Sequence, residues 1–145
     1  MSYHKSTGAV LVDPLCDLFL DPANELRFKG PFNDNVTVSL TLMNPTDRAI
    51  AFKIKTNAFK QYYAKPAVGV LDSAHSIKVN VILVPFQYDP NEIYRHWFKV
   101  EYFYLNDEEI QLSVNDILSM VSGDACGFYS EIFVSVVIVF LVEGY

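Results

Sequence analysis

Hydrophobic and polar residues alternate with a period of two along much of this chain. Such alternation is typical of β-strands with one buried face, because successive side chains point to opposite sides of a sheet. The clearest run spans residues 36–42, where Val and Leu alternate with Thr37, Ser39 and Thr41. Similar short runs predict further strands at 18–20, 26–29, 52–55, 62–65, 68–71, 77–83 and 98–103.

Turn-forming residues separate these predicted strands. The segments 44–47 (NPTD) and 89–92 (DPNE) combine proline with side chains that hydrogen-bond to the local backbone. Short strands with turns every 8–12 residues or so, roughly the spacing seen here, favour an antiparallel β-sandwich. We therefore predict an all-β core over residues 18–105, preceded by an N-terminal extension at 1–17.

Residues 106–145 follow a different pattern and form a divergent, acidic C-terminal segment. Between 107 and 122, apolar residues recur at spacings of three and four, which predicts a short helix. The apolar run 132–142 has about half of the roughly 20 residues that a membrane-spanning helix needs. We predict a final buried strand over 133–142 instead.

Composition agrees with a folded domain in a reducing compartment. The chain has 145 residues, of which 51% are hydrophobic, so it can bury a substantial core. The two cysteines, Cys16 and Cys126, lack the spacing of a zinc site or a disulfide framework. The N-terminal residues also lack the long apolar run of a secretory signal.

Charge is distributed unevenly along the chain. Residues 1–99 carry 11 basic and 9 acidic side chains, a net charge of +2, whereas residues 100–145 carry 8 acidic and no basic ones. The window 48–65 holds five basic residues and no acidic one. A basic patch on an acidic protein predicts an acidic partner, with an ordinary solvated face as the alternative. Because the net charge is −6, we expect no nucleic-acid binding.

Catalytic residue patterns are not apparent. His4, His75 and His96 are scattered, and the sequence has no nucleophile elbow, phosphate-binding glycine loop or zinc-protease motif. The acidic run 107–109 is interpreted as a helix start, where acidic side chains suit the helix dipole. We expect a non-enzymatic protein without metal or cofactor that binds other proteins.

Several motifs between Glu25 and Phe98 occur together in the order found in one known family. They are ELRFKGPF at 25–32, NPTDR at 44–48, AFKIKT at 51–56, PF at 85–86, YDPNE at 88–92, and His96 followed by Phe98. This region, about residues 18–100, resembles the major sperm protein (MSP) domain and more closely the VAMP-associated proteins (VAPs) of the endoplasmic reticulum. The resemblance implies an immunoglobulin-like, seven-stranded antiparallel β-sandwich.

The resemblance also implies a function. VAPs bind short acidic peptides with two phenylalanines, called FFAT motifs, on partners such as lipid-transfer proteins at membrane contact sites. By resemblance, this chain is an adaptor at the cytosolic face of the endoplasmic reticulum, or in the cytoplasm if it has no anchor. Family members continue through a coiled coil to a membrane anchor, and neither is visible here, so membrane association is expected to be indirect or through a missing anchor.

The resemblance places the peptide site partly on the predicted strand around residue 54. Lys53, Lys55 and Thr56 match the family's peptide-contacting strand. Asn57 stands where a second threonine is usual. The lysines are expected to pair with the acidic flank of the peptide, and apolar surface to take its aromatic rings.

The second strand of the site departs from the family pattern. Trp97 replaces a lysine and Lys99 replaces a methionine, so a cation and an apolar side chain have exchanged places on one face. Peptide binding then survives with altered preference or is lost. Phe98 also matches the family, although alternation favours a place for it in the core.

A second interpretation is a structural protein that self-assembles, as the major sperm proteins of nematode sperm do in filaments. It requires concentration-dependent oligomers in the absence of peptide, and a homodimer is also left open. The closer match to the VAP branch favours the adaptor.

Pro66 matches a proline in a family loop that sustains the fold, and its physical interpretation is a constrained turn. We predict that Pro66→Ser lowers the stability of the domain, because serine does not restrict the backbone in this way. The denaturation midpoint measures the effect, and an unchanged midpoint would contradict the prediction.

Overall fold

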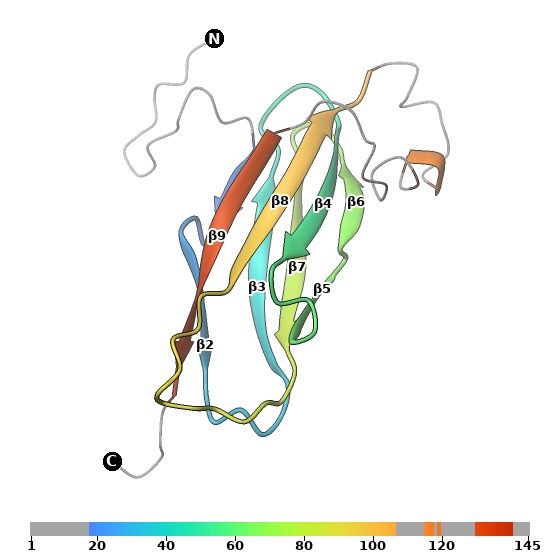
Figure 1. Cartoon of the computed structure of the whole chain (residues 1–145). Coiled ribbons are helices and arrows are strands. Elements are labelled where there is room, and N and C mark those ends of the chain that lie inside the picture. Colours follow the sequence, from blue (N-terminus) through green and yellow to red (C-terminus); the bar gives the residue numbers. More distant parts are fainter. Residues whose placement is uncertain (1–17, 107–114, 118, 120–129, 141–145) are drawn as a thin grey trace, which may run out of the picture.

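Short β-strands account for most of the chain in a computed structural model that describes residues 18–106, 115–117, 119 and 130–140 (Figure 1). Nine strand segments form within these residues, at or near the positions that alternation predicts. They are β1 (Phe19–Asp21), β2 (Glu25–Lys29), β3 (Val36–Met43), β4 (Ile50–Thr56), β5 (Tyr62–Lys65), β6 (Val68–Leu71), β7 (Ser76–Leu83), β8 (Trp97–Tyr104) and β9 (Ser130–Val139).

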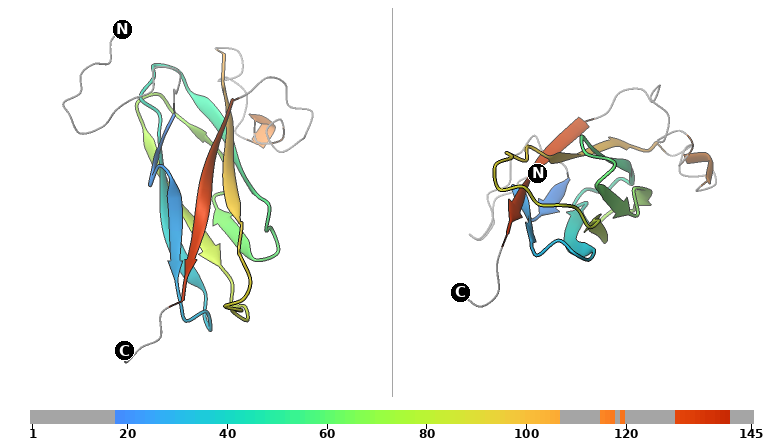
Figure 2. Two further views of the ribbon diagram at one scale, coloured as in Figure 1. Left: turned by 60° about the vertical axis from the view of Figure 1, so that its left-hand side comes forward. Right: turned by 60° about the horizontal axis from the view of Figure 1, so that its bottom comes forward.

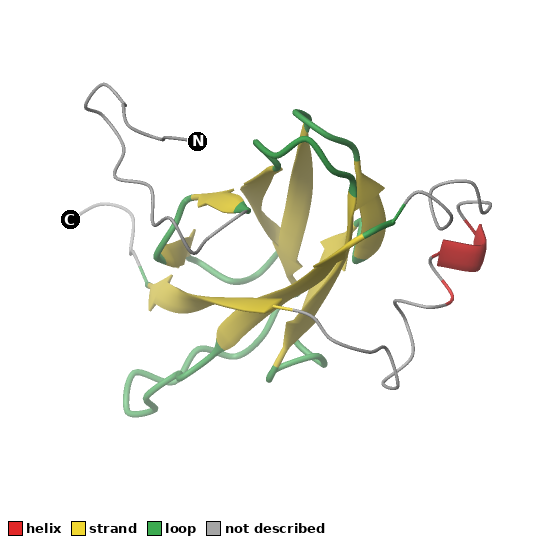
Figure 3. Cartoon of the chain, turned by 90° about the horizontal axis from the view of Figure 1, so that it is seen from above, coloured by secondary structure: helices red, strands yellow, loops and turns green. Residues whose placement is uncertain are grey.

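The strands form two sheets that pack face to face, as Figures 2 and 3 show. One sheet has the order β1-β3-β7-β5, and the other has the order β2-β9-β8-β4-β6. The predicted sandwich is therefore confirmed. Within the described residues, β2 and β9 pair in parallel, whereas the remaining pairs are antiparallel.

The final predicted strand is present as β9, which lies between β2 and β8 in the five-stranded sheet. The nine segments are as many as alternation predicts and two more than the seven that the resemblance implies. β1 is only three residues long, and the stretch from Tyr62 to Leu71 divides into β5 in one sheet and β6 in the other. The crossing between the sheets lies at Pro66, and the Lys65–Pro66 peptide bond is cis.

Inward-facing side chains of both sheets form the core. Phe28, Phe52 and Phe98 are the largest side chains that are fully buried. They come from three neighbouring or near-neighbouring strands of the five-stranded sheet and face Leu40 and Val81 of the other sheet. The burial pattern of β8 alternates at Phe98 and Val100 as a two-residue period requires.

A smaller apolar cluster lies apart from this core. Ile117 packs with Ala49, Ala51 and Leu105. Residues 115–117 and 119 are helical, and they are the described part of the helix predicted at 107–122. The predicted N-terminal extension, the acidic run 107–109, Cys16 and Cys126 lie outside the described residues.

The close approach of Phe52 to Gly69 gives a test of the fold. These residues are partners across β4 and β6, and a Cβ atom at Gly69 would lie 2.8 Å from the buried Phe52 ring. We expect Gly69→Ala to destabilise the domain by about 1–3 kcal/mol, because the ring cannot move without disturbing the core. The free energy of urea unfolding measures this, and adding Phe52→Leu should recover part of the loss. Equal stability of Gly69→Ala and the parent would contradict the proposed packing.

Candidate functional site

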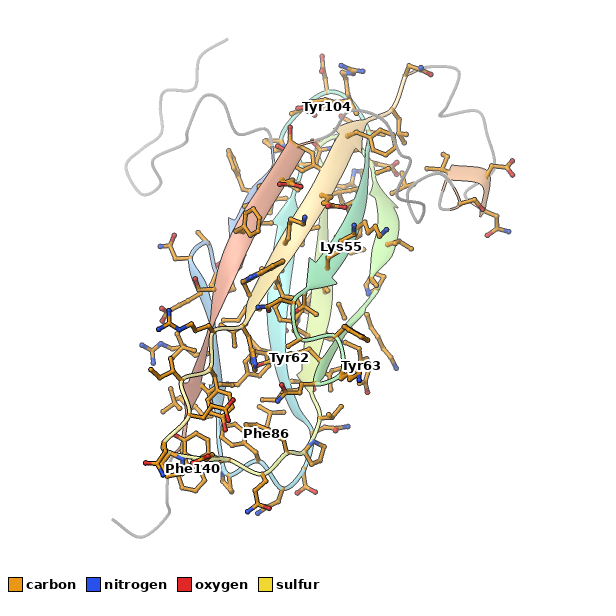
Figure 4. All side chains as sticks on the ribbon, viewed as in Figure 1. Lys55, Tyr62, Tyr63, Phe86, Tyr104 and Phe140 are labelled. Atoms are coloured by element: carbon orange, nitrogen blue, oxygen red, sulfur yellow. The ribbon has the colours of Figure 1, made fainter. Side chains whose placement is uncertain are left out.

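The peptide-site residues nominated from the sequence lie together where β4 ends and β8 begins. The register pairs Lys55 with Lys99 and Thr56 with Phe98. Lys53, Lys55, Trp97 and Lys99 project from the side of the five-stranded sheet that faces away from the core, here called the outer face. Figure 4 shows Lys55 on this face, above Tyr62 and Tyr63.

Thr56 and Asn57 hold the two strands together at this point. The Thr56 hydroxyl donates to the Trp97 carbonyl at 2.8 Å. The Asn57 amide group donates to the Arg95 carbonyl at 3.0 Å and accepts from the Trp97 N–H at 2.9 Å. Both side chains therefore fix the backbone that carries Trp97.

Glu101 is a buried acid on the outer face that sequence reasoning did not nominate. It is 6% exposed, and its two carboxylate oxygens lie 3.4 Å from Lys55 Nζ and 3.0 Å from Lys99 Nζ. Lys99 Nζ also lies 3.2 Å from Glu131 Oε2 on β9. Lys55, one of the two lysines expected to meet an acidic peptide, is thus already close to an acid of the sheet.

These contacts shift the pKa values of Glu101 and Lys99. Burial tends to raise the pKa of Glu101, but the ion pairs with Lys99 and Lys55 hold that pKa below its usual value. The ion pair with Glu101 raises the pKa of Lys99, against the opposing effect of burial. Both groups are therefore charged at neutral pH.

An aromatic pair lies beside these charges. The rings of Trp97 and Phe133 meet edge to face, with centroids 5.3 Å apart and planes at 71°. Phe133 is 55% exposed, and Lys99 Nζ lies 5.7 Å from its ring centroid. Sequence reasoning assigned Phe133 to a buried strand without separating its two faces, although alternation from Ile132 onward would have placed it outside.

A pocket of about 340 Å³ opens between the end of β4 and β5, next to the point where the chain crosses from one sheet to the other. Phe98 lines it despite being only 1% exposed, so this nominated residue is a core residue and contributes a wall rather than an exposed contact. Phe59, which is largely exposed, and Tyr63, which is partly exposed, also line the pocket. The remaining lining residues are Ile54, Lys55, Thr56, Tyr62, Ala64 and Ala67.

Tyr62 is the fixed wall of this pocket. Its ring meets Phe98 edge to face, and its hydroxyl shares a hydrogen bond of 2.8 Å with His96 Nδ1. Burial raises the pKa of Tyr62, and burial lowers the pKa of His96 against the raising effect of Glu92. Both groups are therefore uncharged at neutral pH and serve to hold the loop before β8.

Neither a metal centre nor a membrane span is found in the part of the chain that the structure describes. No group of three or more His, Cys, Asp or Glu side chains lies close enough to hold an ion. None of the described helical residues belongs to a helix that is long and apolar enough to cross a bilayer.

Comparison with protein families gives a clear match. The model of the MSP (major sperm protein) domain matches residues 17–115. The chain belongs to this family. The MSP domain is 53% identical over 94 residues to a vesicle-associated membrane protein/synaptobrevin-binding protein of Aplysia californica, covering 65% of this chain and 36% of that protein. It is 51% identical over 84 residues to human vesicle-associated membrane protein-associated protein B/C, covering 58% and 35%.

The matches cover part of each relative's length and extend to solved structures. The chain spans only about a third of the length of these relatives. Among solved structures, WR4, an MSP family member of Caenorhabditis elegans, matches with a TM-score of 0.61 and 16% identity, covering 84% of this chain and 97% of that one. This likeness confirms the predicted immunoglobulin-like fold of the MSP domain.

The central position of Glu101 predicts a pH-dependent contribution to stability. Glu101→Gln leaves Lys55 and Lys99 facing each other, so we expect a loss of about 1–3 kcal/mol at pH 7. Because folding lowers the pKa of Glu101, its contribution is present above the usual value of 4.5 and is lost as the pH falls through the folded-state pKa. The difference from the parent should therefore shrink at pH 3.

Urea unfolding at the two pH values measures this contribution. Glu25→Gln is the matched control, since Glu25 is an exposed acid that pairs with Arg27, and it should change stability by less than about 0.5 kcal/mol. A loss in Glu101→Gln that is equal at pH 7 and pH 3 would contradict the ion-pair assignment.

Proposed function

We propose that this MSP domain is a non-enzymatic adaptor that binds acidic peptides of the FFAT type on partner proteins. The pocket beside Lys55 carries the proposal, because it is concave, mainly apolar and large enough for one aromatic side chain. A peptide that inserts such a side chain there would have its neighbouring residues beside the end of β4.

Basic residues around the pocket support an acidic flank on that peptide. Lys55 lines the pocket, and Lys60 follows Phe59 in the turn after β4. Lys65 lies at the end of β5, with its Nζ 5.5 Å from the Tyr63 ring centroid. Positive charge at the rim would steer acidic peptides towards the pocket and add most at low salt.

The relatives support the cellular part of the proposal. The Aplysia relative is named as a synaptobrevin-binding protein and the human one as a VAMP-associated protein. Partners such as lipid-transfer proteins, tethered at the cytosolic face of the endoplasmic reticulum or at membrane contact sites, are consistent with this kinship. A homodimer and attachment through a segment beyond this sequence belong to the same proposal.

Titration with an acidic diphenylalanine peptide tests the function. We expect saturable binding at low salt, weakened at least tenfold by Lys55→Asp, which is about 1.4 kcal/mol. Lys60→Asp should weaken it several-fold without touching the ion pairs of Glu101. Lys78→Asp, an exposed lysine on β7 of the other sheet, is the charge-matched control and should bind like the parent.

The proposal fails if the peptide shows no saturable binding, or if Lys55→Asp and Lys60→Asp behave like Lys78→Asp. Sedimentation of the domain without peptide separates the alternative, since a self-assembling protein would form oligomers that grow with concentration.

A further inference from the structure

The part of the outer face formed by β8 and β9 is poorly suited to an acidic ligand. Lys99 Nζ is shared between Glu101 at 3.0 Å and Glu131 at 3.2 Å, and its side chain is only 18% exposed. Glu101 and Glu131 are also direct partners across β8 and β9, so two carboxylates lie side by side there. An incoming carboxylate would compete for Lys99 with acids already held in the sheet and would be repelled by both.

The same two strands present an aromatic surface. Trp97 comes from β8 and Phe133 from β9, and their edge-to-face contact leaves Phe133 more than half exposed. The two residues are diagonal neighbours, because Trp97 is the partner of Ser135 and Lys99 is the partner of Phe133. Adjacent exposed aromatic side chains are enriched at sites that bind other proteins, and a third ring or a branched aliphatic group can pack against such a pair.

We propose that Trp97 and Phe133 form a second, apolar subsite, which selects peptides with an aromatic or aliphatic residue in the flank where an acidic residue would otherwise stand. This inference rests on the proposed function, because the same peptide has its first aromatic residue in the pocket beside Lys55. Charge complementarity decides the class of ligand. The surface around the pocket is basic, whereas Lys99 on the β8–β9 surface is already paired with Glu101 and Glu131.

The strand spacing sets the distance between the two anchoring residues. From the pocket, a peptide crosses β4 and β8 to reach β9, which amounts to two or three strand spacings of about 4.8 Å each. An extended chain advances about 3.3 Å per residue, so the two anchors should be about three to five positions apart. The flanking apolar residue is therefore close in sequence to the pocket residue.

Two peptides of equal length and with the same pocket phenylalanine test this subsite. One has an acidic flank, and the other is identical except that a leucine replaces the acidic residue four positions from the phenylalanine. Neither contains tryptophan, so the emission of Trp97, the single tryptophan of the chain, reports contact at the subsite. Fluorescence anisotropy of labelled peptides gives the dissociation constants at physiological salt.

We expect the leucine peptide to bind at least as tightly as the acidic one and to shift the Trp97 emission. Phe133→Ala should weaken the leucine peptide at least fivefold and the acidic peptide less than twofold. Ile93→Ala, which removes an exposed apolar side chain from the loop before β8, is the control and should change neither. Glu131→Lys should strengthen the acidic peptide several-fold and leave the leucine peptide unchanged.

Two results overturn the inference in different ways. If the acidic peptide binds more tightly and Phe133→Ala leaves the leucine peptide unchanged, the subsite does not exist, while the adaptor function stands. If neither peptide gives saturable binding to the parent domain, the proposed function is wrong and the subsite with it. Thermal unfolding of each variant shows that a lost signal is not due to a lost fold.

Discussion

The register of β4 against β8 is the constraint on which both the core and the outer face depend. The pairing of Lys55 with Lys99 and of Thr56 with Phe98 turns Phe52, Ile54, Phe98 and Val100 inward. A slip of one residue would exchange these side chains with lysines and a glutamate, and burying those charges would cost far more than the slip could gain. Fold stability and site geometry are therefore set by the same hydrogen-bonded pair of strands.

This pairing also brings together charges that are separated in the sequence. The window 48–65 is purely basic, and all residues after 99 that carry charge are acidic. In the sheet, the basic strand β4 lies beside β8, and β8 lies beside β9, so Glu101 and Glu131 reach Lys55 and Lys99. A basic patch counted along the chain is thus partly neutralised across the strands, whereas Lys60 and Lys65 lie next to residues that line the pocket.

Local pattern was sufficient for the strands but not for their partners. Alternation located β3, β4, β7 and β8 within a few residues, and it correctly favoured Phe98 as a core residue. The parallel pairing of β2 with β9, the crossing at Pro66 and the pocket that it opens depend on contacts between distant segments, which no short window contains. Glu101 was missed for the same reason, because a lone acid in a strand acquires its partners only when the neighbouring strands are known.

Trp97 and Lys99 each suit their surroundings on the outer face. Lys99 stands where two carboxylates can pair with it, and Trp97 stands where its ring meets Phe133. A lysine in the place of Trp97 would lie beside Ser135 and an aromatic ring, and an apolar side chain in the place of Lys99 would leave Glu131 without its partner and Glu101 with Lys55 alone. Each side chain therefore has a neighbour that suits its chemistry, and these neighbours lie on β4, β8 and β9. Because β9 supplies two of these neighbours, the chemistry of the outer face depends on a strand that lies outside the residues matched by the family model.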